Sequence, residues 1–203
     1  IMNNKTESVK IINSIIKFLN EGFNVKKSLE ITAKELKLNK KKVEEVNKAV
    51  LYDGINSLII CISLFINQEM KTLVSGDFKK LRVNEKIRFL ILSRLKIIDK
   101  FFDKKSIFKL VIKQKSISKA GLMLFNVSDE IWYLSGDKST DFNYYTKRII
   151  LMNVYSASFF YFLRDNSVEY VKTKDFIDKQ ISYVLKFGKL KSNLSNLIYF
   201  NKT

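Results

Sequence analysis

Two of the side chains that enzymes use most for acid–base and nucleophilic chemistry, histidine and cysteine, are absent or nearly absent from the chain. Its 203 residues include no histidine and a single cysteine. Without histidine, imidazole bases, histidine-activated nucleophiles and histidine-ligated metal sites are excluded. Cys61 lies in the apolar run 58–66, where a thiol usually packs as a small hydrophobic group. We therefore expect no catalytic residue, no metal site, no cofactor and no enzymatic activity.

Two other patterns suggest chemistry but are better explained by structure. The carboxylate pairs Glu44 with Glu45 and Asp175 with Asp178 lie outside apolar sequence that would shift their pKa, so we expect solvated faces. Residues 136–140, Gly-Asp-Lys-Ser-Thr, are similar to the end of a phosphate-binding loop. The first glycine of that pattern is missing and no predicted strand precedes it, which excludes nucleotide binding. The loop instead predicts a cap for the helix that follows.

Apolar residues recur at helical spacing along the chain, and no segment alternates as a strand does. The absence of proline and the presence of only six glycines remove most helix breakers. No apolar run approaches the roughly 18 residues of a membrane span. The pattern predicts an all-α protein with helices over residues 9–23, 26–38, 39–47, 51–73, 83–102, 106–113, 116–134, 141–164 and 169–189, and a break at 75–77.

Residues 129–148, Asp-Glu-Ile-Trp-Tyr-Leu-Ser-Gly-Asp-Lys-Ser-Thr-Asp-Phe-Asn-Tyr-Tyr-Thr-Lys-Arg, closely resemble the signature of a known family. This is the Coq-nine family of lipid-binding accessory proteins of ubiquinone biosynthesis. The resemblance continues at Tyr155-Ser156 and at 163–165, Leu-Arg-Asp, and it is densest from residue 85 to 187. It implies the fold of TetR transcription regulators, a homodimer, and binding of an isoprenoid lipid or quinone intermediate. It also implies presentation of that lipid to a partner, the di-iron hydroxylase of the ubiquinone pathway.

The expected organisation follows from the resemblance and the helix pattern together. Residues 1–50 are expected to form a degenerate helix-turn-helix segment, and residues 51–190 a helical domain for lipid binding and dimerisation. Residues 191–203 are expected to form a C-terminal tail.

The predicted helix 141–164 is rich in aromatic and aliphatic side chains. A cavity for an isoprenoid needs apolar walls between helices. Our candidates for the lipid contacts are Ile149, Met152, Tyr155, Phe159 and Phe162. The alternative is ordinary core packing, because an aromatic stripe at helical spacing more often belongs to the core.

The family uses an exposed acidic and aromatic patch to dock on the hydroxylase. The resemblance carries this role to Asp129, Trp132 and Tyr133. The alternative for Trp132 is core packing, which is common for so large an aromatic side chain. Exposure of its ring distinguishes the two.

The formal charge of +17 favours anionic partners such as nucleic acid or anionic lipid. The lysines are dispersed, and an AT-rich genome also enriches lysine, so part of this charge needs no partner. As an alternative function, a TetR-like regulator could contact DNA phosphates through Lys26, Lys27 and Lys40 to Lys42. Glu44 and Glu45 in the would-be recognition helix, which has no arginine, argue against sequence-specific binding.

The two ends of the chain bear on its location in the cell. Near the C-terminus, Ile181, Val184, Leu185, Leu190, Leu194, Leu197 and Ile198 alternate with Lys186, Lys189 and Lys191. Such a basic amphipathic helix can lie on an anionic membrane, and the alternative is a packing or dimerisation helix. The first residues lack an apolar signal core. We expect a bacterial cytoplasmic protein, with peripheral contact to the inner membrane as the further option.

Overall fold

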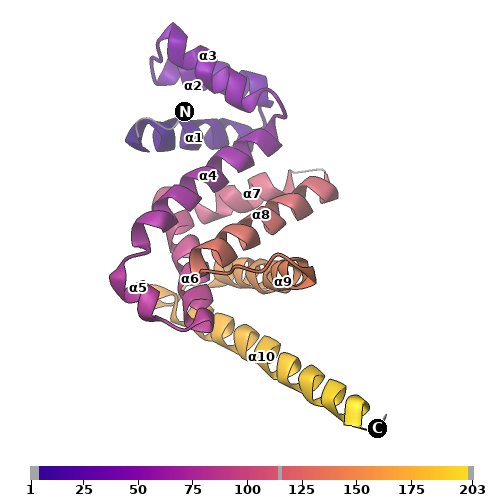
Figure 1. Cartoon of the computed structure of the whole chain (residues 1–203). Coiled ribbons are helices and arrows are strands. Elements are labelled where there is room, and N and C mark those ends of the chain that lie inside the picture. The colour runs from indigo at the N-terminus through magenta and orange to yellow at the C-terminus, as the bar shows by residue number, and fades with distance from the viewer. Residues whose placement is uncertain (1–4, 114–115, 201–203) are drawn as a thin grey trace. The chain divides into compact units, whose positions relative to one another are not determined.

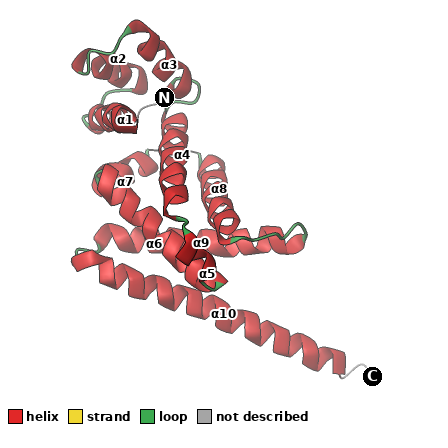
Figure 2. Ribbon diagram, turned by 60° about the vertical axis from the view of Figure 1, so that its left-hand side comes forward, coloured by secondary structure: helices red, strands yellow, loops and turns green. Residues whose placement is uncertain are grey.

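A computed structural model describes residues 5–113 and 116–200, with the side chains of 187–200 outside the description. Every element in the described ranges is helical (Figures 1 and 2), which confirms the all-α prediction. The α-helices are α1 (Lys5–Asn20), α2 (Val25–Glu35), α3 (Lys40–Val50), α4 (Ile55–Leu73), α5 (Gly76–Lys80), α6 (Val83–Phe101), α7 (Lys104–Ile112), α8 (Ile117–Ser135), α9 (Phe142–Arg164) and α10 (Val171–Phe200). The 3-10 helix η1 (Val168–Tyr170) precedes α10.

Helix α5 begins within the predicted break at 75–77 and continues to Lys80, in a stretch where no helix was predicted. This short helix buries Phe78, whose ring lies 5.5 Å from that of Phe89 in α6. Five residues are too few for a helix to be stable alone. A tertiary aromatic contact, absent from any local pattern, therefore supports α5.

The chain divides into two compact units, and helices α6 and α8 each contribute residues to both. The first unit contains residues 1–75 and 93–127. The second contains residues 76–92 and 128–203. The boundaries of these packing units differ from the expected boundaries at residues 50 and 190. The expected division concerns function and stays a prediction.

In the first unit, α1 packs against α2 and α7, and α3 packs against α2 and α4 (Figure 1). Arg94 interrupts the apolar stripe of α6 and is buried. Its guanidinium donates to Ser63 Oγ at 2.8 Å and to Asn67 Oδ1 at 2.5 Å, both on α4. These hydrogen bonds compensate for burying a charge in an otherwise apolar core.

In the second unit, α10 packs against α9. The buried apolar side chains of this unit come from α5, α6, α8, α9 and α10: Phe78, Ile87, Leu90, Ile91, Ile131, Leu151, Val154, Tyr155, Phe162 and Ile177. Two of them, Tyr155 and Phe162, were predicted to contact lipid.

No single helix in the described ranges has both the length and the apolar composition of a membrane span. Helices α3 and α4 meet that test only as a pair, and they are bent by 104° at the break between them. Residues 191–200 of the predicted tail continue helix α10, and residues 201–203 lie outside the described part of the chain. The side chains of Leu190, Leu194, Leu197 and Ile198 also lie outside it.

Candidate functional site

An apolar groove of about 420 Å³ lies within the second unit, between α6, α8, α9 and α10. Its volume falls in the range of about 300–1,000 Å³ that is usual for small-molecule sites. Eight aliphatic side chains and three polar residues form its walls: Val83, Ile87, Ile150, Leu151, Val154, Ile181, Val184 and Leu185, with Asn84, Trp132 and Lys147. We call this the apolar groove.

One face of α9 and the Trp132 ring are held in place as walls of the groove. Lys147, Ile150, Leu151 and Val154 recur at spacings of three and four, which places them on one side of α9. Trp132 Nε1 donates to the backbone carbonyl of Lys147 at 3.1 Å. The Lys147 ammonium lies 5.3 Å from the centre of the indole ring, within cation–π range. The wall is therefore fixed by side chains of both helices.

Charged side chains fasten the end of α8 to the start of α9 beside this wall. The buried Arg148 pairs through Nε with Asp129 at 2.6 Å and through Nη1 with Asp137 at 3.2 Å. Lys147 Nζ pairs with the other oxygen of Asp137 at 2.7 Å. Burial raises the pKa of Asp137, but hydrogen bonds from Lys147, Ser139 and Arg148 outweigh it and hold the pKa at about 2. We call Asp129, Asp137, Lys147 and Arg148 the ion-pair cluster.

The loop between α8 and α9 is a pair of helix caps. Gly136 has φ 88°, and the amides of Gly136 and Asp137 donate to the carbonyls of Tyr133 and Trp132. This is the Schellman pattern that ends α8. Asp141 Oδ1 accepts the Asn143 amide at 3.0 Å and caps α9. The capping prediction is confirmed for Asp141.

The five predicted lipid contacts lie on other parts of α9. Ile149 is 53% exposed, Met152 and Phe159 are half-buried, and Tyr155 and Phe162 are buried. The Phe162 ring packs against Tyr170, with centroids 4.9 Å apart. None of the five lines the apolar groove. As lipid contacts they stay predictions, and a spacing pattern could not have chosen between adjacent residues such as Ile149 and Ile150.

The three predicted partner contacts differ in exposure. Tyr133 is 67% exposed. Trp132 is half-buried and forms a wall of the groove, while Asp129 accepts hydrogen bonds from Arg148 and from the Tyr144 hydroxyl. Sequence reasoning passed over the exposed Phe142 and Tyr145 on α9. Their spacing of three at a helix start was the signal that could have found them.

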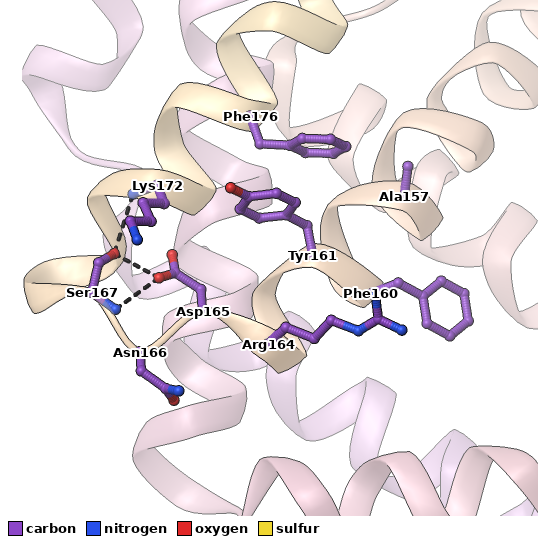
Figure 3. A pocket seen from close by; sticks show the side chains of 9 residues that line it. All are labelled: Ala157, Phe160, Tyr161, Arg164, Asp165, Asn166, Ser167, Lys172 and Phe176. Carbon is purple, nitrogen blue, oxygen red and sulfur yellow. Dashed lines mark hydrogen bonds between the residues drawn. The ribbon is translucent and has the colours of Figure 1, made fainter.

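A second pocket of about 660 Å³ lies where α9 turns into α10, also within the second unit (Figure 3). Sequence reasoning did not predict it. Its lining residues are Ala157, Phe160, Tyr161, Arg164, Asp165, Asn166, Ser167, Lys172 and Phe176. We call it the junction pocket.

The floor of the junction pocket is ordered by Asp165. One carboxylate oxygen accepts the Ser167 amide at 2.8 Å and hydroxyl at 2.6 Å. The other accepts the Thr173 amide at 2.8 Å and hydroxyl at 2.6 Å. Burial raises the pKa of Asp165, but these four hydrogen bonds hold it well below its usual value. The carboxylate thus fixes the turn between the two helices.

Helices α2 and α3 contain the lysines of the alternative regulator function. Lys26, Lys40 and Lys41 are exposed, whereas Lys42 pairs with Glu7 at 3.4 Å and with Glu45 at 3.5 Å. The TetR-like fold, the helix-turn-helix and its DNA binding stay predictions.

Comparisons with known proteins point to one family. Residues 117–188 match the COQ9 family. The chain is 32% identical over 142 residues to "Probable ubiquinone biosynthesis protein coq9, mitochondrial" of Dictyostelium discoideum, covering 70% of this chain and 45% of that protein. It is 24% identical over 124 residues to "Ubiquinone biosynthesis protein COQ9, mitochondrial" of Rattus norvegicus, covering 61% and 40%. It is 37% identical over 81 residues to the coq9 protein of Schizosaccharomyces pombe, covering 40% and 31%.

The chain spans less than half the length of these relatives. Their names call them mitochondrial, and the bacterial location stays a prediction for this chain. The matched residues include the whole of α8 and α9, the ion-pair cluster and the junction pocket. Over residues 117–188, the chain therefore belongs to the COQ9 family.

Proposed function

We propose that this protein binds an isoprenoid lipid in the apolar groove and serves ubiquinone biosynthesis as a non-catalytic accessory protein. The observation that carries the proposal is an apolar groove formed largely by the COQ9-like segment. Eight of its eleven lining residues fall within 117–188. We take the pathway from the names of the relatives and the ligand class from the aliphatic side chains that line the groove.

The composition of the walls favours a hydrocarbon chain with a small polar head. Burial of apolar surface contributes about 25 cal/mol per Å² to binding before the costs of association are subtracted. Asn84 and Lys147 are the polar residues that can orient a head group. The Lys147 ammonium has three N–H donors, of which Asp137 and Ser139 accept two, whereas the single N–H of Trp132 already donates to a backbone carbonyl. Specific polar groups in an apolar pocket fix the orientation of a ligand. The groove therefore suits a quinone intermediate with an isoprenoid tail.

A neighbouring pair of isoleucines provides a matched test. Ile150 lines the groove and is 37% exposed, whereas Ile149 lies outside it and is 53% exposed. We expect Ile150→Asp to lose co-purified lipid and Ile149→Asp to keep it, as measured by native mass spectrometry followed by organic extraction. Both side chains reach solvent, so both variants are expected to fold, and circular dichroism checks this.

The opposite outcome is equally informative. Loss of lipid from Ile149→Asp alone would assign the lipid to the exposed side of α9 at Ile149, one of our sequence candidates. A native protein that neither co-purifies with nor takes up an isoprenoid quinone would refute lipid carriage.

We further propose that the exposed aromatic side chains of α8 and α9 dock on a partner hydroxylase. Tyr133 is 67% exposed and Tyr145 is 58% exposed. The Tyr145 ring contacts the half-buried Tyr144, whose hydroxyl donates to Asp129, so Tyr144 links the acidic residue to the exposed aromatic one. Exposed aromatic side chains commonly anchor protein interfaces.

The docking proposal is tested by tyrosine replacement. We expect Tyr133→Ala with Tyr145→Ala to weaken hydroxylase binding at least tenfold, measured by surface plasmon resonance, with lipid content unchanged. Tyr183→Ala on α10 is the control, because Tyr183 is 61% exposed but lies on another helix. Equal losses in both proteins would contradict a specific patch.

A further inference from the structure

The junction pocket is separate from the apolar groove, with which it shares no lining residue. Its volume of about 660 Å³ is also in the range of ligand sites. No part of the proposed lipid-carrier function uses it. Its chemistry can therefore be considered by itself.

Two cations at this pocket lack an anionic partner. Arg164 at the end of α9 and Lys172 at the start of α10 are both exposed, and neither forms an ion pair with any residue in the described ranges. The carboxylate that lines the pocket, Asp165, is buried, and both of its oxygens already accept hydrogen bonds from Ser167 and Thr173. The pocket thus presents two cations against a single, already hydrogen-bonded carboxylate.

Arg148, earlier on the same helix, shows what a structural arginine looks like here. It is buried and pairs with Asp129 and Asp137. Arg164 lies in the last turn of α9, where the helix dipole favours a cation, and it lines a pocket without an ion pair to any described residue. Its charge therefore stays available to a ligand. Arginine and lysine together can surround a phosphate, because the guanidinium binds two oxygens while an ammonium approaches a third.

The other walls of the pocket are aromatic. The rings of Tyr161 and Phe176 stack with centroids 4.4 Å apart and planes 11° apart, joining α9 to α10 (Figure 3). Phe160, on the preceding position of α9, is 53% exposed. Aromatic faces and edges favour flat or unsaturated hydrocarbon over a hydrated ion.

We propose that the junction pocket binds an amphiphile with a phosphate head and a flat or unsaturated apolar stem. Figure 3 draws the charged ends of Arg164 and Lys172 on different sides of the pocket, so these exposed side chains turn towards the phosphate to hold it. Phe160 and the Tyr161–Phe176 stack contact the stem. The rim also bears apolar side chains, because Val168 is 84% exposed and Val171 is 52% exposed. A ligand presented by a lipid bilayer and a dissolved aryl or alkenyl phosphate share this chemistry.

Calorimetric titration of the full chain with 1-naphthyl phosphate tests the proposal. We expect the native protein to bind 1-naphthyl phosphate more tightly than inorganic phosphate, because only 1-naphthyl phosphate has an apolar stem. The double variant R164Q/K172Q should bind roughly tenfold more weakly or worse, as expected for the loss of charge-assisted hydrogen bonds. Phe160→Ala should weaken binding of 1-naphthyl phosphate and leave binding of inorganic phosphate unchanged.

The matched control is K174Q/K179Q. Both lysines are exposed on α10 and neither lines the pocket, so the variant makes the same change in net charge. We expect its affinity to stay within twofold of the native value. Equal weakening in the two double variants, equal affinity for 1-naphthyl phosphate and inorganic phosphate, or no binding by the native protein would overturn the proposal.

Vesicles identify the source of the ligand. Competition by phosphatidic acid vesicles, but not by phosphatidylcholine vesicles, with loss in R164Q/K172Q, would support a bilayer lipid. Binding of 1-naphthyl phosphate without such competition would support a dissolved phosphate. Retention of isoprenoid quinone by R164Q/K172Q would show that the apolar groove works independently of this pocket.

Discussion

The two ends of α9 contain similar charged residues in different settings. At the N-terminal end, Arg148 is buried and pairs with Asp129 and Asp137. At the C-terminal end, Arg164 is exposed, while the buried Asp165 accepts hydrogen bonds from the amide and hydroxyl groups of Ser167 and Thr173. An arginine is thus structural where carboxylates surround it. Where the neighbouring carboxylate is satisfied by neutral donors, the cation remains available to a ligand.

The C-terminal end of α9 should depend for its stability on apolar packing. Phe162 has 0% exposure and packs on Tyr170. We expect Phe162→Ala to lower the free energy of unfolding by about 3–5 kcal/mol, the usual cost of removing a buried aromatic ring. Urea denaturation measures the change, with the exposed Ile149→Ala as a control that should stay within about 0.5 kcal/mol. Equal effects would contradict the burial of Phe162.

The N-terminal end should depend on the ion-pair cluster. Replacing Arg148 with Met leaves Asp129 and Asp137 without their shared cation. Removal of one partner from a buried ion pair costs about 3 kcal/mol or more. Arg164→Met is the matched control and should change the free energy of unfolding by less than about 0.5 kcal/mol. If the two variants are equally stable in urea, the comparison between the two arginines fails.

Lowering the pH should destabilise the N-terminal end of α9, because Asp137 becomes protonated. Its pKa of about 2 in the folded protein is below the usual value of 3.8, so the unfolded chain takes up a proton first as the pH falls. The stability that Asp137 contributes, on the order of 2 kcal/mol, is complete above about pH 4 and is lost between pH 4 and pH 2.

Asp137→Asn isolates this contribution. The variant should be less stable than the native protein at neutral pH, and the difference should shrink as the pH is lowered to 2. The pKa of Asp165 is depressed in both proteins, so its contribution to the pH dependence of stability cancels in the comparison. Urea midpoints at several pH values provide the measurement, and a difference that does not change with pH would contradict the depressed pKa of Asp137.

The hydrogen bonds of Asp165 should contribute the smallest of these effects. Asp165→Ala leaves the Thr173 amide and hydroxyl without their acceptor, and loss of such a helix cap costs about 1–2 kcal/mol. Thermal unfolding followed by circular dichroism measures it, with the exposed Asp175→Ala as control. A result for Asp165→Ala within error of the control would show that the turn does not depend on this carboxylate.

Helices and caps were predictable from the sequence to the extent that they depend on neighbours in the chain. The predicted end of α6 at Phe102 and the observed end at Phe101 differ by one residue, because a repeat of three and four is a local signal. The short α5 was missed because its Phe78 is stabilised by Phe89, a residue outside the helix. The candidate site was harder to predict because pockets form between helices.

Residue type and spacing were enough to predict the helical class, the absence of histidine chemistry, the cap at Asp141 and the resemblance to one family. Packing between helices selects which side of α9 faces the groove. Apolar residues occur all around this helix, so Ile149 and Ile150 are equivalent in pattern and differ only through their neighbours. The same holds for Arg148 and Arg164, because only packing brings Asp129 and Asp137 to the first and leaves the second exposed.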